Sequence, residues 1–244
     1  MAIDLYDVIQ PIAYGAGWEV DPLVLAPDTI QLSSALHRFT CLVKQGVGRG
    51  FVLSFSSTAL SNELRKRNGE LVVHPIVDLD VLRVILRDAS VLAGSLPDSP
   101  LLEYDTKIRD LSIDETEVRR EVEQRVGQDI YRNHMLSYWE GRCALTYIGE
   151  PELLFASHAK PWKDCTSAEE RLNVFNGFLL EARFDRLFDR GFITFDDRGT
   201  LLVSKRLEPA PLSVLGLDKR MELRWIREEH LPFLHWHRKH VFGR

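Results

Sequence analysis

The stretch Arg142–Gly191 constrains the fold more than any other part of the chain, because turn residues and apolar patterns alternate closely along it. Residues 143–147 read as a short strand, which a turn at Gly149–Pro151 ends. Residues 153–159 read as a returning strand. We therefore expect these two strands to pair with each other as a β-hairpin.

A short helix ends this stretch at Gly191. Its apolar residues recur at i, i+3 and i+4, which predicts one buried face. These residues are Phe184, Leu187 and Phe188. Asp185 and Asp189 are four positions apart and share another face. A helix packed on the hairpin would bring Asp185 opposite His158, which lies at the end of the returning strand.

These residue types suit the hydrolysis of a phosphodiester. The neutral imidazole of His158 can take a proton from water. The carboxylate of Asp185 can hold a hard divalent cation, which would neutralise charge on the phosphate and on the leaving oxygen. Asn176 stands before Gly177 in a turn, where its amide can fix the imidazole ring or a strand.

The same stretch resembles the HNH endonucleases of the ββα-metal type, in the branch found in restriction-like enzymes. The resembling segments are RVGQDIYR (Arg125–Arg132), YWEGRCALT (Tyr138–Thr146), ASHAKPW (Ala156–Trp162), NGFLL (Asn176–Leu180), FDRLFDRGFITF (Phe184–Phe195) and the tail Leu223–Phe242. The order of SHAKPW, NG and LFDRG carries most of the likeness. It covers roughly the C-terminal half and leaves residues 1–114 unmatched.

The resemblance implies roles for three residues. His158 matches the general base, and Asn176 matches the Asn of the motif. Asp185 occupies the place of the final His, where a metal ligand is expected. Ser157 departs from the pattern, because many members have a metal-binding Asp there. Asp189 is a rival ligand; we favour a structural role for it, at the helix end or beside Arg190.

The remaining sequence predicts an α+β protein with two domains. Residues 1–114 read as an α+β domain that recognises DNA, and residues 115–244 as the HNH nuclease domain with a leading helix and a C-terminal tail. We expect a turn or linker at residues 95–100 and a helix from Asp114, interrupted or bent at Gly127.

Two smaller features of residues 1–114 have a simpler interpretation than a site. The glycine-rich segment Gln45–Gly50 invites comparison with a nucleotide-binding loop, but such a loop opens a helix and here the strand Phe51–Phe55 follows. We favour a hairpin turn. His74, in an apolar strand beside Pro75, reads as a core histidine rather than a ligand.

The charge balance permits a DNA-binding protein without requiring one. The formal net charge is −5. This excess falls within residues 1–114, whereas residues 115–244 carry equal numbers of basic and acidic side chains and the tail 210–244 is basic. In that tail, His235–His240 could suggest a second metal site; we favour packed apolar residues with the His and Arg side chains at the surface.

Composition argues against disulfide-rich, zinc-stabilised, membrane-spanning and secreted proteins. The three cysteines are far apart and form no CxxC pair, so we expect neither a disulfide framework nor a structural zinc site, and a reducing cytoplasm fits best. We expect no membrane span and no signal peptide, since no suitable apolar run occurs.

Together these features predict a hydrolase that cuts double-stranded DNA. We expect a restriction or defence endonuclease that uses Mg²⁺, or Mn²⁺, and reads either a short sequence or a modified base through residues 1–114. Two antiparallel strands to be cut favour a homodimer. The alternative is a DNA-binding module with an HNH-shaped but catalytically inactive domain.

Overall fold

The computed structural model divides the chain into two compact units, residues 1–99 and residues 100–244. It describes residues 4–46, 50–69, 75–109, 116–207, 209–217 and 220–244. This division after residue 99 differs from the boundary at residue 114 expected from the sequence. Most of α4 (Asp98–Arg109) belongs to the second unit, where its Glu103 accepts a 2.9 Å hydrogen bond from His134. Helices and strands are mixed, as expected for an α+β protein. None of the described helices combines the length and apolar character needed to cross a membrane.

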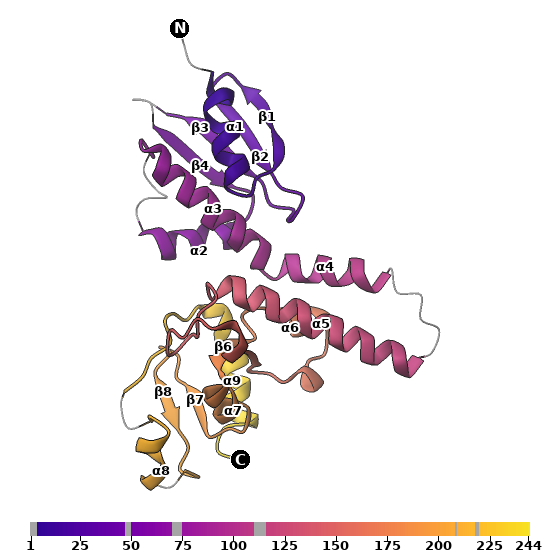
Figure 1. Ribbon diagram of the computed structural model, residues 1–244, viewed down its shortest axis with the longest axis vertical. Coiled ribbons are helices and arrows are strands. Elements are labelled where there is room, and N and C mark those ends of the chain that lie inside the picture. Colours follow the sequence, from indigo (N-terminus) through magenta and orange to yellow (C-terminus); the bar gives the residue numbers. More distant parts are fainter. Residues whose placement is uncertain (1–3, 47–49, 70–74, 110–115, 208, 218–219) are drawn as a thin grey trace. The chain divides into compact units, whose positions relative to one another are not determined.

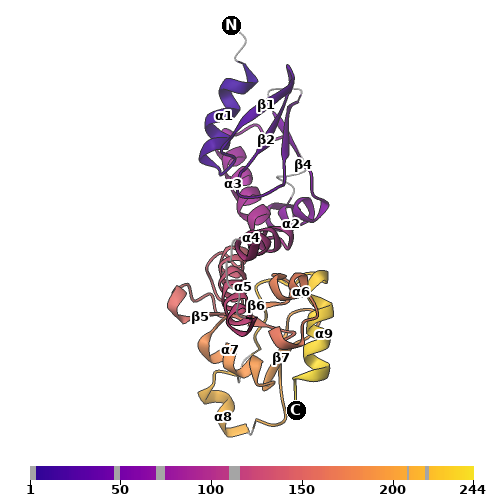
Figure 2. The same cartoon turned by 90° about the vertical axis from the view of Figure 1, so that its right-hand side faces the viewer.

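The first unit is built on a four-stranded antiparallel sheet in the order β1-β2-β3-β4. The strands are β1 (Val20–Ala26), β2 (Thr29–Ser33), β3 (Cys41–Gln45) and β4 (Phe51–Phe55). Alternate residues of β2, β3 and β4 are buried, such as Ile30 and Leu32. This period of two gives the sheet one apolar face, and Figure 2 shows α1 and α3 along one side of it.

The helices of this unit begin and end where the sequence places their caps. These helices are α1 (Leu5–Gly15), α2 (Thr58–Asn68) and α3 (Leu79–Ser95). Asp4, Ser57 and Asp78 each accept a hydrogen bond from a backbone N–H of the first turn, and Gly69 ends α2. The indole of Trp18 donates a 2.8 Å hydrogen bond to the Leu86 carbonyl, which ties the end of α1 to α3. Figure 1 shows these two helices side by side.

The glycine-rich segment joins two antiparallel strands, as a hairpin turn does. Gln45 pairs with Phe51, and the N–H of Gly46 donates to the carbonyl of Gly50 at 2.7 Å. No helix follows, because β4 begins at Phe51. Residues 47–49 themselves lie outside the described residues, and so do His74 and Asp114.

Two expectations concern the middle of the chain. Of the turn or linker expected at residues 95–100, residues 96–97 form a turn, and α4 already begins at Asp98. Gly127 does not split the next helix, because α5 (Thr116–Tyr138) runs through it; the alternative, a bend at Gly127, stays a prediction. A Cβ atom at Gly127 would lie 2.4 Å from the ring of Trp162, so this glycine makes room for that ring.

The predicted hairpin of residues 143–147 with residues 153–159 was also wrong. Residues 144–146 form a turn, and β5 (Leu154–His158) pairs antiparallel with β6 (Gly177–Glu181). Short helices fill the connections, namely η3 (Pro151–Leu153), η4 (Trp162–Asp164) and α6 (Ala168–Leu172). The long connection between β5 and β6, which contains η4 and α6, begins directly after His158 at the end of this strand pair.

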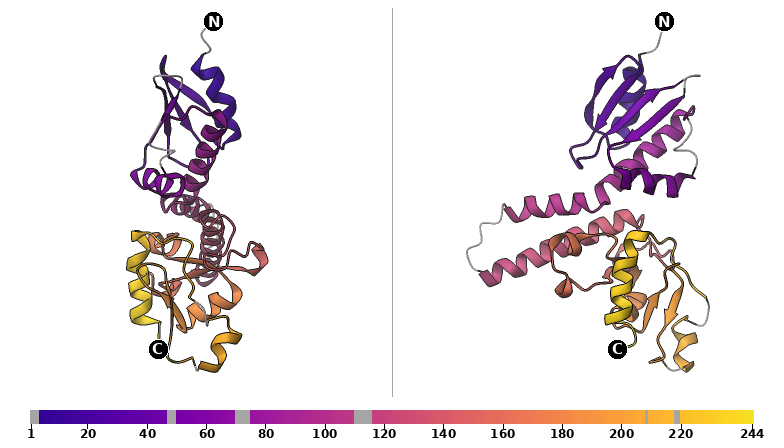
Figure 3. Two further views of the ribbon diagram at one scale, coloured as in Figure 1. Left: turned by 90° about the vertical axis from the view of Figure 1, so that its left-hand side faces the viewer. Right: turned by 180° about the vertical axis from the view of Figure 1, so that it is seen from behind.

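The C-terminal segment packs against the helix that follows β6. This helix, α7 (Ala182–Asp189), buries Phe184, Leu187 and Phe188, as the spacing predicts. The hairpin of β7 (Ile193–Phe195) and β8 (Leu201–Val203) turns at Gly199. The remaining elements are α8 (Pro209–Val214), η5 (Glu228–His230) and α9 (Leu231–His240), and Figure 3 shows α9 beside the β7–β8 hairpin.

The histidines of the tail do not form a metal site in the part of the chain that the structure describes. His237 is buried, so the expectation that these side chains stay at the surface was wrong for it. Its ring lies between Thr194 Oγ1, at 3.0 Å, and the carbonyl of Phe188, at 3.0 Å. His235 instead pairs with Asp197 at 3.1 Å. His237 therefore holds α9 onto α7 and β7.

Candidate functional site

The β5–β6 pair places His158 directly opposite Gly177. Gly177 has φ of 153° and comes so close to β5 that a Cβ atom would lie 1.9 Å from the carbonyl oxygen of Ser157. Only glycine fits this approach. The Asn-Gly sequence therefore fixes the end of the strand pair at which His158 leaves β5.

The helix α7 brings a carboxylate to the same end. Its apolar face packs on β5 and β6, which leaves Asp185 on the side of β5. The hydroxyl of Ser157 donates a 2.5 Å hydrogen bond to Oδ1 of Asp185. The two positions where the family resemblance expects metal ligands are thus in direct contact, one with a hydroxyl and one with a carboxylate.

His158 and Asp185 line one open pocket with a volume of about 360 Å³. The side chains around its charged part are Ser157, Lys163, Arg186, Asp189 and Arg190. The structure thus brings two of the three predicted site residues to one cavity, with both acidic and basic groups on its wall. A phosphate group and a cation could both be held in such surroundings.

The imidazole of His158 is held on three sides. Its Nε2 lies 2.8 Å from the carbonyl oxygen of Arg171. A carbonyl can only accept, so Nε2 carries the proton and Nδ1 keeps the lone pair of a neutral ring. Tyr131 stacks on the ring at 3.8 Å between centroids, and the edge of Trp162 stands against it at 5.9 Å.

This environment keeps His158 in the form that a base requires. Burial lowers the pKa of His158 to about 4, although the hydrogen bond to Arg171 opposes this change. The ring is therefore neutral at pH 7. No hydrogen bond from a described residue engages Nδ1, which leaves that nitrogen able to accept a proton from water.

Asn176 is completely buried and does not line the pocket of His158 and Asp185. Its Oδ1 accepts from the N–H of Lys160 at 2.8 Å. Its Nδ2 donates to the carbonyls of Lys160 and Glu170 and to Sγ of Cys165, at 3.1, 2.9 and 3.4 Å. The amide thus fastens the connection between the strands to the start of β6. Asn176 therefore holds the loop that supplies the Arg171 carbonyl.

Arg171 and Tyr131 complete the support, and neither was predicted from the sequence. Nε of Arg171 donates to the carbonyl of Trp162 at 3.3 Å, and Nη2 donates to that of Cys165 at 3.1 Å. The hydroxyl of Tyr131 donates to the carbonyl of Asn176 at 3.0 Å. Arg132 of α5 donates to the carbonyls of Pro151 and Leu154.

The two carboxyl groups of α7 repel each other. Partial burial raises the pKa of Asp189 to about 6, and the neighbouring charge of Asp185 adds to this. Burial also raises the pKa of Asp185, while the hydrogen bond from Ser157 opposes it. Asp189 lines the pocket, so its structural role at the helix end stays a prediction, as does its rival role as a ligand.

The oxygen atoms around Asp185 are of the kind that binds a hard divalent cation. They are the carboxylates of Asp185 and Asp189 and the hydroxyl of Ser157, and oxygen donors are those that Mg²⁺ and Mn²⁺ prefer. A divalent cation would also relieve the repulsion that raises the pKa of Asp189. No group of three His, Cys, Asp or Glu side chains gathers here among the described residues, so water and phosphate oxygens would complete the coordination.

The comparison with protein families agrees with this geometry. Residues 143–196 match the family described as HNH endonuclease. The match spans β5, β6 and α7 with the whole pocket between them. No curated protein matches the chain. Residues 143–196, in the C-terminal half, are therefore similar to the HNH endonucleases, a family of nucleases.

Proposed function

We propose that this HNH domain hydrolyses phosphodiester bonds of double-stranded DNA with a divalent metal ion. The observation that carries the proposal is the single pocket lined by both His158 and Asp185. In it, Nδ1 of His158 would accept the proton of the attacking water, since its Nε2 is committed to Arg171. The negative phosphate would raise the pKa of His158 on binding and so strengthen it as a base.

Asp185 would hold the metal ion, and Asp189 and the hydroxyl of Ser157 would lie close to it. Mg²⁺ is the ion that such oxygen donors favour, with Mn²⁺ as a substitute. The bound ion would supply charge neutralisation at the phosphate and at the leaving oxygen. Asn176 would keep the loop and the Arg171 carbonyl in place, so that the imidazole of His158 does not rotate.

The wider role we propose is that of a restriction or defence endonuclease. Residues 1–114 would select the target by reading a short sequence or a modified base, and the HNH domain would cut it. A homodimer would present one site to each of two antiparallel strands. The three cysteines form no disulfide, which suits a protein of the reducing cytoplasm.

The second candidate is a module that binds DNA and does not cut it. The contact between Ser157 and Asp185 favours this candidate, because the hydroxyl occupies one carboxylate oxygen that a metal ion would otherwise use. The two candidates differ in one result, since only the nuclease produces metal-dependent strand breaks.

The test is incubation with plasmid DNA in Mg²⁺ or Mn²⁺, using unmodified and 5-methylcytosine-containing DNA, followed by mapping of the ends. The nuclease gives nicked or linear DNA, and His158→Ala abolishes the cutting while DNA binding persists. The mapped ends distinguish sequence reading from modified-base reading. Shifted but intact DNA under every metal condition would support the non-cutting module, and sedimentation of a monomer on DNA would exclude the homodimer.

A further inference from the structure

A second and larger pocket opens on the other side of Trp162, within the second unit. Its volume is about 590 Å³, in the range of ~300–1,000 Å³ typical of small-molecule sites. Side chains of α4, α5, η4 and α6 form its wall. Pro161, Trp162 and Lys163 line both this pocket and the one with His158. The two cavities are therefore neighbours that share one wall.

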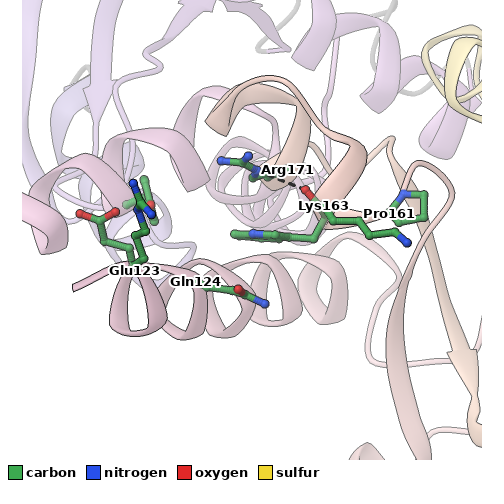
Figure 4. A pocket seen from close by; sticks show the side chains of 8 residues that line it. Glu123, Gln124, Pro161, Lys163 and Arg171 are labelled. Atoms are coloured by element: carbon green, nitrogen blue, oxygen red, sulfur yellow. Dashed lines mark hydrogen bonds between the residues drawn. The ribbon is translucent and has the colours of Figure 1, made fainter. Parts of the chain in front are cut away.

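Aromatic and basic side chains line this pocket together. The aromatic ones are Tyr104 and Trp162. The basic groups are Arg120, Lys163 and Arg171. Figure 4 shows Glu123 and Gln124 on one side and Arg171 with Lys163 on the other. The pocket thus offers ring faces, an excess of positive charge, and an amide and a carboxylate able to read a polar edge.

The shared wall is rigid. Trp162 fits against Gly127, where a Cβ atom would lie 2.4 Å from its ring. Arg171 stands over the ring at 5.7 Å and donates to the backbone carbonyl of Trp162. The same ring stands at a right angle to the imidazole of His158, with 5.9 Å between the ring centroids. A ligand in the second pocket would therefore lie one indole away from the general base.

We propose that the second pocket holds an unpaired nucleotide of the DNA strand beside the bond that is cut. A base fits ring faces such as those of Tyr104 and Trp162, and its phosphate fits Arg120 and Lys163. Gln124 and Glu123 can pair with the edge of a base. A base inside a duplex is stacked on both faces, so only a base that has left the stack can enter.

This inference rests on the proposed function, because it names the form of DNA that the nuclease takes. The substrate class that follows is duplex DNA with an extruded or unpaired nucleotide next to the cleavage position. The pocket accepts an unmodified base or one modified at the edge that Glu123 and Gln124 contact, and in this way it contributes to the choice of target.

The test is a binding measurement without metal, so that it does not depend on cutting. Three fluorescein-labelled duplexes of identical sequence are compared by anisotropy: one fully paired, one with a single bulged nucleotide, and one with a bulged abasic residue. We expect the bulged nucleotide to bind at least about fivefold more tightly than the paired duplex, the factor that ~1 kcal/mol of stacking gives.

Variants of the pocket decide where this preference arises. Tyr104→Ala and Arg120→Ala should each reduce it to less than twofold. Arg120 is exposed, so its removal leaves the core intact if Tyr104→Ala fails to fold. Arg125→Ala is the matched control, because Arg125 is exposed on the same helix and does not line the pocket; it should keep the preference.

Three results would overturn the proposal: equal affinity for paired and bulged DNA, equal affinity for the abasic and nucleotide bulges, or a preference that survives both pocket variants. The second result would mean that only the sugar–phosphate backbone is bound. Cleavage is measured separately in Mg²⁺. A preference without any cutting would refute the nuclease function and not the ligand, whereas cutting without a preference would refute the ligand alone.

Discussion

Replacing Asn176 with Ala removes the hydrogen bonds that join the start of β6 to the loop supporting His158. The change deletes an acceptor for the N–H of Lys160 and a donor for the carbonyls of Lys160 and Glu170. Buried hydrogen bonds contribute about 1–1.5 kcal/mol each, and unpaired buried groups cost more, so we expect the free energy of unfolding to fall by about 3–5 kcal/mol.

The same change should slow cleavage more than it weakens DNA binding. The loop released by Asn176→Ala contains Arg171, whose carbonyl holds Nε2 of His158. With that partner displaced, the imidazole can rotate, and we expect the single-turnover rate to fall at least about tenfold. The affinity for DNA should stay within about twofold, because Asn176 is buried and contacts no substrate.

Urea denaturation and single-turnover cleavage at pH 7.5 measure the two effects. Asn173→Ala is the matched control, since the side chain of Asn173 accepts one hydrogen bond, from the N–H of Phe175 at 2.9 Å. It should cost about 1 kcal/mol and leave the rate unchanged. An Asn176→Ala variant as stable and as fast as the Asn173→Ala variant would refute the positioning role.

Further predictions concern the strand pair, the carboxylates and the buried histidine. Gly177→Ala should lower the free energy of unfolding by more than about 2 kcal/mol, because its methyl group would overlap the Ser157 carbonyl; thermal denaturation checks this, and an unchanged Tm would contradict it. Asp185→Asn should weaken Mn²⁺ binding, measured by calorimetry at pH 7.5, by at least about tenfold. The affinity of the wild-type protein for Mn²⁺ should decline below pH 6, because protonated Asp189 no longer contributes its negative charge. Equal wild-type affinities at pH 5 and pH 7.5 would contradict this. Burial lowers the pKa of His237 from 6.5 to about 4, so the unfolded state binds more protons than the folded state between these pH values. The free energy of unfolding should therefore fall by up to about 3 kcal/mol as the pH falls from 6.5 to 4. Urea denaturation across this range should show a smaller loss for His237→Gln, and an identical loss would contradict the buried neutral state of His237.

Helix ends were predictable because their signals are local. Ser57 and Asp78 cap α2 and α3 through bonds to residues at most three positions away, so the sequence narrows each cap to one of two nearby residues, Ser56 or Ser57 and Asp78 or Asp80. The apolar spacing of Phe184, Leu187 and Phe188 likewise depends only on neighbouring residues, and α7 forms where it was expected.

Strand pairing was predicted wrongly because the partner of β5 lies beyond a long connection. A nearby turn favoured residues 143–147, yet β6 pairs instead. Four of its five residues are buried, so β6 carries a continuous apolar run rather than an alternating one. The run Phe178–Leu180 was a signal for a strand covered on both faces, and giving it more weight would have found the pair.

Part of the candidate site could be predicted from the sequence. The family resemblance supplied His158 and Asp185, and the structure places both on one pocket. The support of His158 had no sequence signal: the Arg171 carbonyl is a backbone group, and Tyr131 reaches the ring from another helix. His237 did have a signal, since it follows Leu234 by three positions on one helix face, and that face is buried.

Chemical rescue of a His158→Ala variant tests the central claim most directly. A general base contributes about 10²–10⁴-fold, so the variant should lose at least a hundredfold in single-turnover cleavage with Mg²⁺ while its affinity for DNA is retained. Added imidazole can enter the open pocket of about 360 Å³ and should restore part of the rate. Cleavage by His158→Ala at the wild-type rate, without imidazole, would contradict the assignment of His158 as the base.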